Sequence, residues 1–299
     1  MDDSINIQYF YLGFTGVLFL FGAFTNLCSF CTFIRPKPRK LSVGNYLLIV
    51  SILNTCAIFC LFIELIQSLG FTSDVSCKIS NYLLSVFTRC TYWLTTWITI
   101  DRLRTSLSPM NTTLKNPGIA IFFSIISLVL LFVMDVHELI VFKQIKQFDS
   151  SKTHCVIDLT QPIIATYNRI STICHYIIPF LVQAISISLL ILFIARSRAK
   201  TTGHKLTFRQ VLMKQFYTQK ELYITPTIIV LSALPQIILS TVLACNTELS
   251  NSQRHLLRIG YLLAFTPQAL GFILYVLPST EYTKEFSQTF LGKNLLKNQ

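Results

Sequence analysis

Long apolar stretches alternate with short polar segments along the whole chain. Each stretch is close to the roughly 20 residues that an α-helix needs to cross a membrane. Pro36 and Pro38 end the first stretch, and Pro109 and Pro117 bracket the segment after the third. The pattern predicts seven membrane-spanning helices, at residues of about 8–34, 43–69, 78–106, 117–142, 164–195, 222–245 and 255–278.

The composition supports a membrane protein. Hydrophobic residues make up 52% of the 299 residues and charged residues 13%, which is about half the charged share of a typical soluble protein. The polar segments are too short to hold a separate soluble domain, so we expect one all-α membrane domain over residues 1–299. No internal repeat is visible, which argues against a transporter built from inverted halves.

The basic residues gather on one side of the predicted helices. The net charge is +12, but no basic patch is interleaved with aromatic residues, so we expect no binding of nucleic acid. Cytoplasmic loops carry an excess of Lys and Arg, which predicts an extracellular N-terminus. The basic residues assigned to the cytoplasmic side are Arg35, Lys37, Arg39, Lys40, Arg102, Arg104, Lys115, Arg196, Arg198, Lys200, Lys205, Arg209, Lys214, Lys220, Lys284, Lys293 and Lys297.

Motifs for catalysis or metal binding are lacking in the sequence. Most of the nine cysteines lie in apolar stretches, and no cysteine or histidine pairs have zinc-site spacing. His137 and Glu138 stand side by side, but no HExxH motif accompanies them. We therefore expect no enzyme, no metal and no cofactor. A polytopic transporter or channel remains one possible class of membrane protein.

The third predicted helix carries a distinctive pair of ends. Asp101 and Arg102 stand where its apolar stretch finishes, and Cys77 lies 24 residues before Asp101. At 1.5 Å per residue this separation is about 36 Å, or one bilayer crossing. A charged side chain at a membrane edge is costly unless it has a partner of opposite charge. A change of partner can therefore favour one of two states of a protein over the other.

On these residues the chain resembles the rhodopsin-like G-protein-coupled receptors over nearly its whole length, and in particular divergent orphan and neuropeptide-type receptors of invertebrates. The resemblance implies a plasma-membrane receptor that passes an extracellular signal to a heterotrimeric G protein. It implies that Asp101 pairs with Arg102 at rest, although Leu103 stands where the family has Tyr. It also implies a disulfide between Cys77 and Cys155, which lies in the connection after the fourth helix.

Other family positions match only in part. Asn26 and Asn54 stand at positions that anchor helix packing in the family. Either Asn54 or Thr55 replaces an Asp that binds sodium in the family. Pro179 and Pro235 match the prolines of the fifth and sixth helices. Tyr275 matches the conserved Tyr of the seventh. The resemblance implies a role in activation and G-protein coupling for Asp101, Arg102, Pro235, Tyr275 and Tyr282.

Two other features depart from the family pattern. Ala233 stands where the family has a Trp, and Gln215 replaces the acid that restrains the Arg in many members.

After the seventh helix, Tyr282, Phe286 and Phe290 recur every four residues. This spacing predicts a short amphipathic eighth helix at about 279–291, lying on the membrane surface.

Ionisable residues within the predicted spans are candidates for ligand binding, because such groups are costly in a membrane. Leu84 stands where amine receptors of the family have an Asp, and the seventh span has no Lys for retinal. We therefore expect a peptide or a small non-amine ligand, with a β-hairpin in the connection 143–163. Pairing with another helix is the alternative role for Glu64 and Arg89. The candidate residues are Glu64, Arg89, Arg169, Arg254, Arg258 and Tyr261.

Overall fold

The structure, a computed structural model, describes residues 2–68, 73–107, 116–146, 153–157, 161–201, 209–210, 213, 221–243 and 250–296. Helices make up nearly all of it. In chain order the elements are α1 (Asp2–Phe33), α2 (Pro36–Arg39), α3 (Ser42–Ser68), α4 (Asp74–Leu107), α5 (Pro117–Met134), η2 (Asp135–His137), α6 (Glu138–Val141), β1 (Phe142–Lys146), β2 (Thr153–Ile157), α7 (Pro162–Thr201), α9 (Glu221–Leu243), α10 (Asn251–Ala264), α11 (Thr266–Ala269), α12 (Gly271–Tyr275), α13 (Thr280–Ser287) and α14 (Phe290–Leu296).

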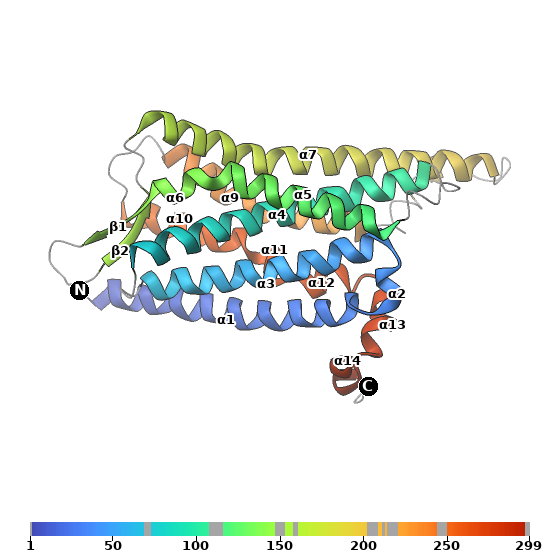
Figure 1. Cartoon of the computed structure of the whole chain (residues 1–299), viewed down its shortest axis with the longest axis horizontal. Helices are drawn as coiled ribbons and strands as arrows, with labels where there is room; N and C mark the ends of the chain where they lie inside the picture. The colour runs from blue at the N-terminus through green and yellow to red at the C-terminus, as the bar shows by residue number, and fades with distance from the viewer. Residues whose placement is uncertain are drawn as a thin grey trace.

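The long helices run side by side along the length of the molecule, and its two ends differ (Figure 1). One end holds the N-terminus and the β1–β2 hairpin, and the other holds α2 and α13. Among the long helices, α3 packs against α1 and α4, α4 packs against α7, and α9 packs against α10. The two strands pair antiparallel with Gln144 opposite Cys155, so the predicted connection does contain a hairpin.

Large apolar side chains cover much of the outer surface of the bundle. In the part of the chain that the structure describes, four helical stretches are long and apolar enough to cross a membrane: Phe10–Phe33, Ser42–Gln67, Pro117–Val141 and Pro162–Ser197. Their outward faces carry exposed residues such as Val17, Leu20 and Val133. A soluble protein would bury such faces, whereas lipid solvates them. Apart from the short hairpin, the chain is therefore an all-α membrane protein.

Helix α4 occupies the centre of the bundle. It contacts α3, α5, α6 and α7, and it is far less apolar than the four stretches above. Its threonine hydroxyls donate hydrogen bonds to backbone carbonyls of the preceding turn. Thr95 donates to Tyr92 O (2.8 Å), and Thr99 donates to Thr96 O (2.8 Å). A polar helix is stable here because its side chains meet other helices instead of lipid.

Within the described residues, helical segments lie in each predicted range, but three ranges are not single helices. The range 117–142 consists of α5, the 3₁₀ turn η2 and α6, and Phe142 already belongs to β1. The range 255–278 begins earlier, at Asn251, and is divided into α10, α11 and α12 by turns at Phe265 and Leu270. Pro267 contributes to this break because it has no N–H to donate. The predicted helix at 279–291 consists of α13 and α14. Between them the Thr289 hydroxyl accepts a bond from Gly292 N (3.0 Å), so Thr289 begins a new helix.

Candidate functional site

A small cavity lies at the end of the bundle that is opposite the hairpin. Its volume is about 80 Å³, and its walls come from α3, α4, α7, α9, α12 and α13. Arg102 of α4 lines it together with Thr225 of α9, Tyr275 of α12 and Tyr282 of α13. The fold therefore brings together three residues, Arg102, Tyr275 and Tyr282, that the sequence assigned to one function.

Asp101 is buried beside this cavity and is held by a neighbouring helix. The Ser42 hydroxyl, at the start of α3, donates a hydrogen bond to its carboxylate. The guanidinium groups of Arg104 and Arg102 lie within electrostatic reach of the same carboxylate. Ser42 was not among the residues that the sequence singled out, because its partner is 59 positions away.

A hydrogen bond between two helices lies in the wall of the cavity. The Thr225 hydroxyl of α9 donates to the Leu274 carbonyl of α12 (3.4 Å), and both residues line the cavity wall. Gln183 of α7 forms a further part of the wall and is buried. An α-helix is about 10 Å across, so the cavity is far too small to admit a segment of another protein.

Charged residues fix α13 against the end of α1 and α2. Arg35 Nε donates to Glu285 Oε2 (3.0 Å) and Arg35 Nη2 donates to Gln288 Oε1 (2.7 Å). Lys37 Nζ lies 3.4 Å from Glu285 Oε1 and 3.5 Å from Glu281 Oε1. The hydrogen bonds to Glu285 and Glu281 raise the pKa of Lys37 above its usual value.

The apolar face of α13 completes this contact. The Tyr282 ring lies edge-on to Phe33 of α1 (5.1 Å between centroids). The Phe286 ring lies in the same way against Phe272 of α12 (4.6 Å). Both α13 residues are buried, whereas Phe290 is exposed. The four-residue spacing of aromatic residues thus continues from α13 onto an exposed position of α14.

Asn26 and Asn54 lie together at the crossing of α1, α3 and the α11–α12 segment. Asn26 Nδ2 donates to Gln268 O (2.8 Å), and Asn54 Oδ1 accepts from the Thr91 hydroxyl of α4 (3.2 Å). A Cβ on Gly271 would lie 2.5 Å from Asn26 Oδ1. The helices can approach this closely because residue 271 has no side chain.

The two helix prolines occupy different surroundings. Pro179 is buried within α7, and its carbonyl accepts a bond from the Thr96 hydroxyl of α4 (3.3 Å). Pro235 is half-buried within α9. Next to it, a Cβ on Gly260 of α10 would lie 3.3 Å from Gln236 N, so α10 packs closely against the backbone of α9 at this point.

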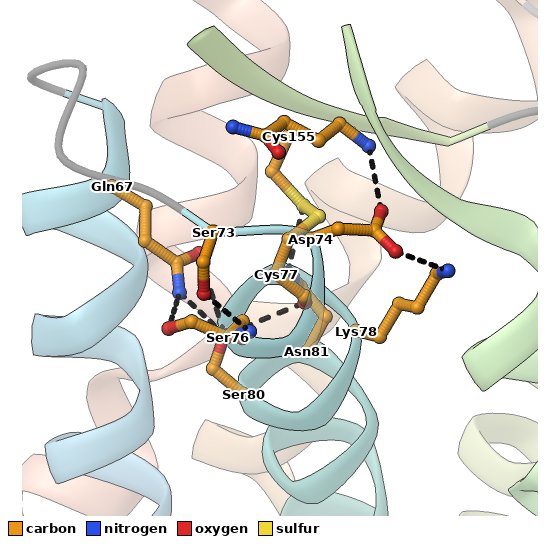
Figure 2. The surroundings of a disulfide bond; sticks show 10 residues. Gln67, Ser73, Asp74, Ser76, Cys77, Lys78, Ser80, Asn81 and Cys155 are labelled. Carbon is orange, nitrogen blue, oxygen red and sulfur yellow. Dashed lines mark hydrogen bonds and ion pairs between the residues drawn. A yellow bond between two sulfur atoms is a disulfide. The ribbon is translucent and has the colours of Figure 1, made fainter.

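The hairpin is tethered to the opposite end of α4 by the disulfide between Cys77 and Cys155 (Figure 2). Asn81 Nδ2 donates to Cys155 Sγ (3.4 Å). Asp74 Oδ1 accepts from the Gln144 amide of β1 (3.4 Å), and Lys78 Nζ donates to Asp74 Oδ2 (2.5 Å). The bond with Lys78, and then that with Gln144, lower the pKa of Asp74 below its usual value.

Glu64 and Tyr261 are joined directly. The Tyr261 hydroxyl of α10 donates to Glu64 Oε2 of α3 (2.5 Å), and the Tyr261 ring lies edge-on to Phe265 (5.0 Å). A carboxylate and a phenol from two helices thus form one polar group in largely apolar surroundings. This contact corresponds to the alternative role of Glu64, pairing with another helix.

The other basic candidates lie apart from this pair. The Arg258 guanidinium carbon lies 5.7 Å from the centre of the Tyr11 ring, a cation–π arrangement between α10 and α1. Arg169 is exposed on α7. The side chain of Arg254 lies outside what the structure describes, as does Gln215.

Arg89 is buried in an ionic cluster. Its Nη1 forms an ion pair with Asp135 Oδ1 of η2, and its Nη2 lies 2.9 Å from Glu138 Oε1 of α6. Nη2 also donates to the Thr172 hydroxyl of α7 (3.2 Å). One guanidinium thus joins three segments of the bundle. This is the pairing alternative for Arg89, and it leaves the guanidinium few donors for a ligand.

Asp135 and Glu138 were visible in the sequence as charged residues in an apolar range, but their role was missed. They stand three positions apart, so a helix places them on one face. In the third predicted range, Arg89 is the only Lys or Arg between Lys78 and Arg102. That coincidence was the available signal for the cluster.

Comparison with known proteins assigns the chain to no family. No protein-family model matches the chain, and no curated protein is significantly similar to it in sequence.

Proposed function

We propose that this chain is a G-protein-coupled receptor of the rhodopsin-like kind, located in the plasma membrane with its N-terminus outside the cell. In this proposal seven segments cross the membrane: α1, α3, α4, α5 with α6, α7, α9, and α10 to α12. Helices α13 and α14 lie on the cytoplasmic surface as an eighth helix. The observation that carries the proposal is the cavity at Arg102, which joins residues from six helices at one end of the bundle.

The two ends of α4 support this orientation. One end holds the disulfide-tethered hairpin, which suits an oxidising exterior. The other end holds Arg102, and the basic residues of α2 lie at that end of the bundle, which suits the cytoplasmic side. The 34 residues of α4 extend for about 50 Å, enough to cross a bilayer with its headgroups.

The mechanism is a shift between a closed and an open cavity. The Thr225 bond to Leu274 holds α9 against α12 in the closed state. When α9 swings outward near Pro235, this bond breaks, and the widened cavity exposes Arg102 to a G protein. A ligand favours this state only by binding the open form more tightly than the closed form.

The ligand would bind at the opposite end, under the hairpin. Glu64 with Tyr261 offers a hydrogen-bonding acid, and Arg258 offers a positive charge near the rim. Leu84 is buried, so the third helix has no acid there to pair with an amine. These features favour a peptide or a small non-amine ligand.

The test measures nucleotide exchange with the full chain in lipid nanodiscs. Purified G proteins of the four major classes are added, and GTP analogue uptake is compared with that of empty nanodiscs. We expect Thr225→Ala to raise ligand-independent exchange on at least one class, and Arg102→Ala in that background to reduce it at least tenfold. Lys40→Ala, a change of an exposed basic residue after α2, should retain it.

One result would overturn the proposal. If the wild type and Thr225→Ala both match empty nanodiscs for every G-protein class, the cavity does not serve a G protein. Solute movement across the same membranes would then favour a transporter.

A further inference from the structure

A second, larger cavity lies between α4, α7 and α9. Its volume is about 250 Å³. Gln183 lies in the walls of both cavities, but the remaining walls differ. The residues that line the larger cavity are Tyr92 of α4; Tyr176, Ile177, Pro179, Phe180, Leu181 and Gln183 of α7; and Ile229, Ala233, Leu234 and Ile237 of α9.

The cavity exists because a small residue stands at a buried position. Ala233 is buried among larger residues of α7 and α9, and its methyl group fills little of the space between the helices. Protein interiors are packed as densely as organic crystals, with few voids larger than a water molecule. A void of this size is therefore costly when it is empty, and its cost falls when an apolar molecule fills it.

The polar groups at the wall already have partners. Gln183 Nε2 donates to the Thr95 and Thr96 hydroxyls (3.0 and 2.9 Å). The Tyr92 hydroxyl donates to the Ala264 carbonyl (3.3 Å). The rest of the wall is almost wholly aliphatic or aromatic. A ligand rich in hydrogen-bonding groups would lose its contacts with water here and gain little in return.

The rim of the cavity reaches the outer surface of the bundle. Leu181 of α7 and Leu234 of α9 both line the cavity and are 50% and 45% exposed. In a membrane protein this surface meets lipid, where apolar molecules concentrate. The way in is therefore sideways, between α7 and α9, and it differs from the hairpin end at which Glu64 and Tyr261 lie.

We propose that this cavity binds one small apolar molecule, a compact cyclic or aromatic hydrocarbon of about ten carbon atoms that enters from the bilayer. The size follows from the volume, since an apolar cavity of about 150 Å³ binds benzene. The proposal does not depend on G-protein coupling, because the cavity and its wall are the same whatever the chain signals to.

The test uses the full chain in nanodiscs with radiolabelled naphthalene as the probe. Unlabelled naphthalene in excess removes the bound label from a saturable site but leaves the label dissolved in lipid. We expect saturable binding of one probe per chain. Ala233→Phe fills the cavity and should weaken this binding at least tenfold. Leu231→Phe, a change at a 65% exposed position of the same helix, should leave it unchanged.

The opposite change tests the same site if Ala233→Phe does not fold. Ile229→Ala enlarges the cavity and should strengthen the binding of anthracene, a larger probe, at least tenfold relative to the wild type. The proposal is overturned if the wild type shows no saturable binding, as when a lipid chain holds the cavity. It is also overturned if a folded Ala233→Phe binds naphthalene as the wild type does, or if Ile229→Ala leaves anthracene binding unchanged.

Discussion

Ser42, the first residue of α3, donates a hydrogen bond to the carboxylate of Asp101 near the end of α4. The bond joins two helices directly beside the cavity that Arg102 lines. In the proposed receptor it would hold the end of α4 in the closed arrangement, as a contact between helices that adds to the attraction between Asp101 and its neighbouring arginines.

Loss of this bond should favour the open cavity. A hydrogen bond to a charged group contributes about 1.5–3 kcal/mol. Each 1.4 kcal/mol changes an equilibrium constant, here that between the closed and open cavity, by a factor of about ten. We expect Ser42→Ala to raise ligand-independent nucleotide exchange by roughly tenfold in nanodiscs. Thr105→Ala is the matched control, because that hydroxyl bonds only to the Asp101 carbonyl within α4 (2.8 Å). Equal exchange by both variants would contradict this role for Ser42.

The ionic cluster should be a main source of stability. Arg89→Met leaves the Asp135 and Glu138 carboxyl groups buried without their cation. Breaking a buried pair in this way costs about 3–5 kcal/mol, which is measurable by denaturant unfolding in detergent. The triple variant Arg89→Met/Asp135→Asn/Glu138→Gln should recover part of the loss, because no charge remains uncompensated. An Arg89→Met protein as stable as the wild type would show that the cluster contributes nothing.

The contact between Glu285 and Arg35 should hold α13 in place. Glu285 is buried and binds both Arg35 and Lys37, whereas Glu281 is exposed and lies near Lys37 only. We expect Glu285→Ala to speed amide hydrogen exchange in α13 at least tenfold, because Arg35 loses its charged partner. Glu281→Ala should change the exchange little. Similar exchange rates in the two variants would mean that apolar packing alone holds the helix.

The contact between the hairpin and Asp74 should depend on pH. The bonds with Lys78 and Gln144 stabilise the charged carboxylate, so the pKa of Asp74 is lower in the folded chain. The stability that the Asp74 carboxylate contributes to the folded chain is therefore fully present above its unfolded pKa of about 3.9. It is lost as the pH falls through the lower pKa of the folded chain. The Gln144 amide shift in NMR spectra should titrate with a midpoint below 3.9, and Asp74→Asn should abolish the titration. A midpoint above 3.9 would contradict the geometry.

The sequence predicted that the chain is helical and apolar, because apolar length is a strong local signal, and four of the described helical stretches are long and apolar enough to cross a membrane. The family resemblance predicted the disulfide between Cys77 and Cys155. It also gave Arg102, Tyr275 and Tyr282 a shared role, and the structure places all three in the wall of one cavity. The sequence did not show that the seventh range is broken at Phe265 and Leu270, because the pattern there stays apolar.

Contacts between distant segments were harder to predict. The partners of Arg89 are 46 and 49 positions away, and those of Arg35 are more than 200 positions away. Periodicity carries no information about such pairs. The large cavity at Ala233 was also invisible, since a missing volume depends on how three helices pack and not on any one of them.

The most direct test of the account is the side of the membrane on which each end of the bundle lies. Single cysteines replace two exposed residues, Gln161 before α7 and Lys40 after α2, and a membrane-impermeant maleimide is applied to cells. The account predicts that Gln161→Cys is labelled on intact cells above the wild-type background, and that Lys40→Cys is labelled only after permeabilisation. Labelling of Lys40→Cys on intact cells would put the Arg102 cavity outside the cell and contradict the proposed receptor.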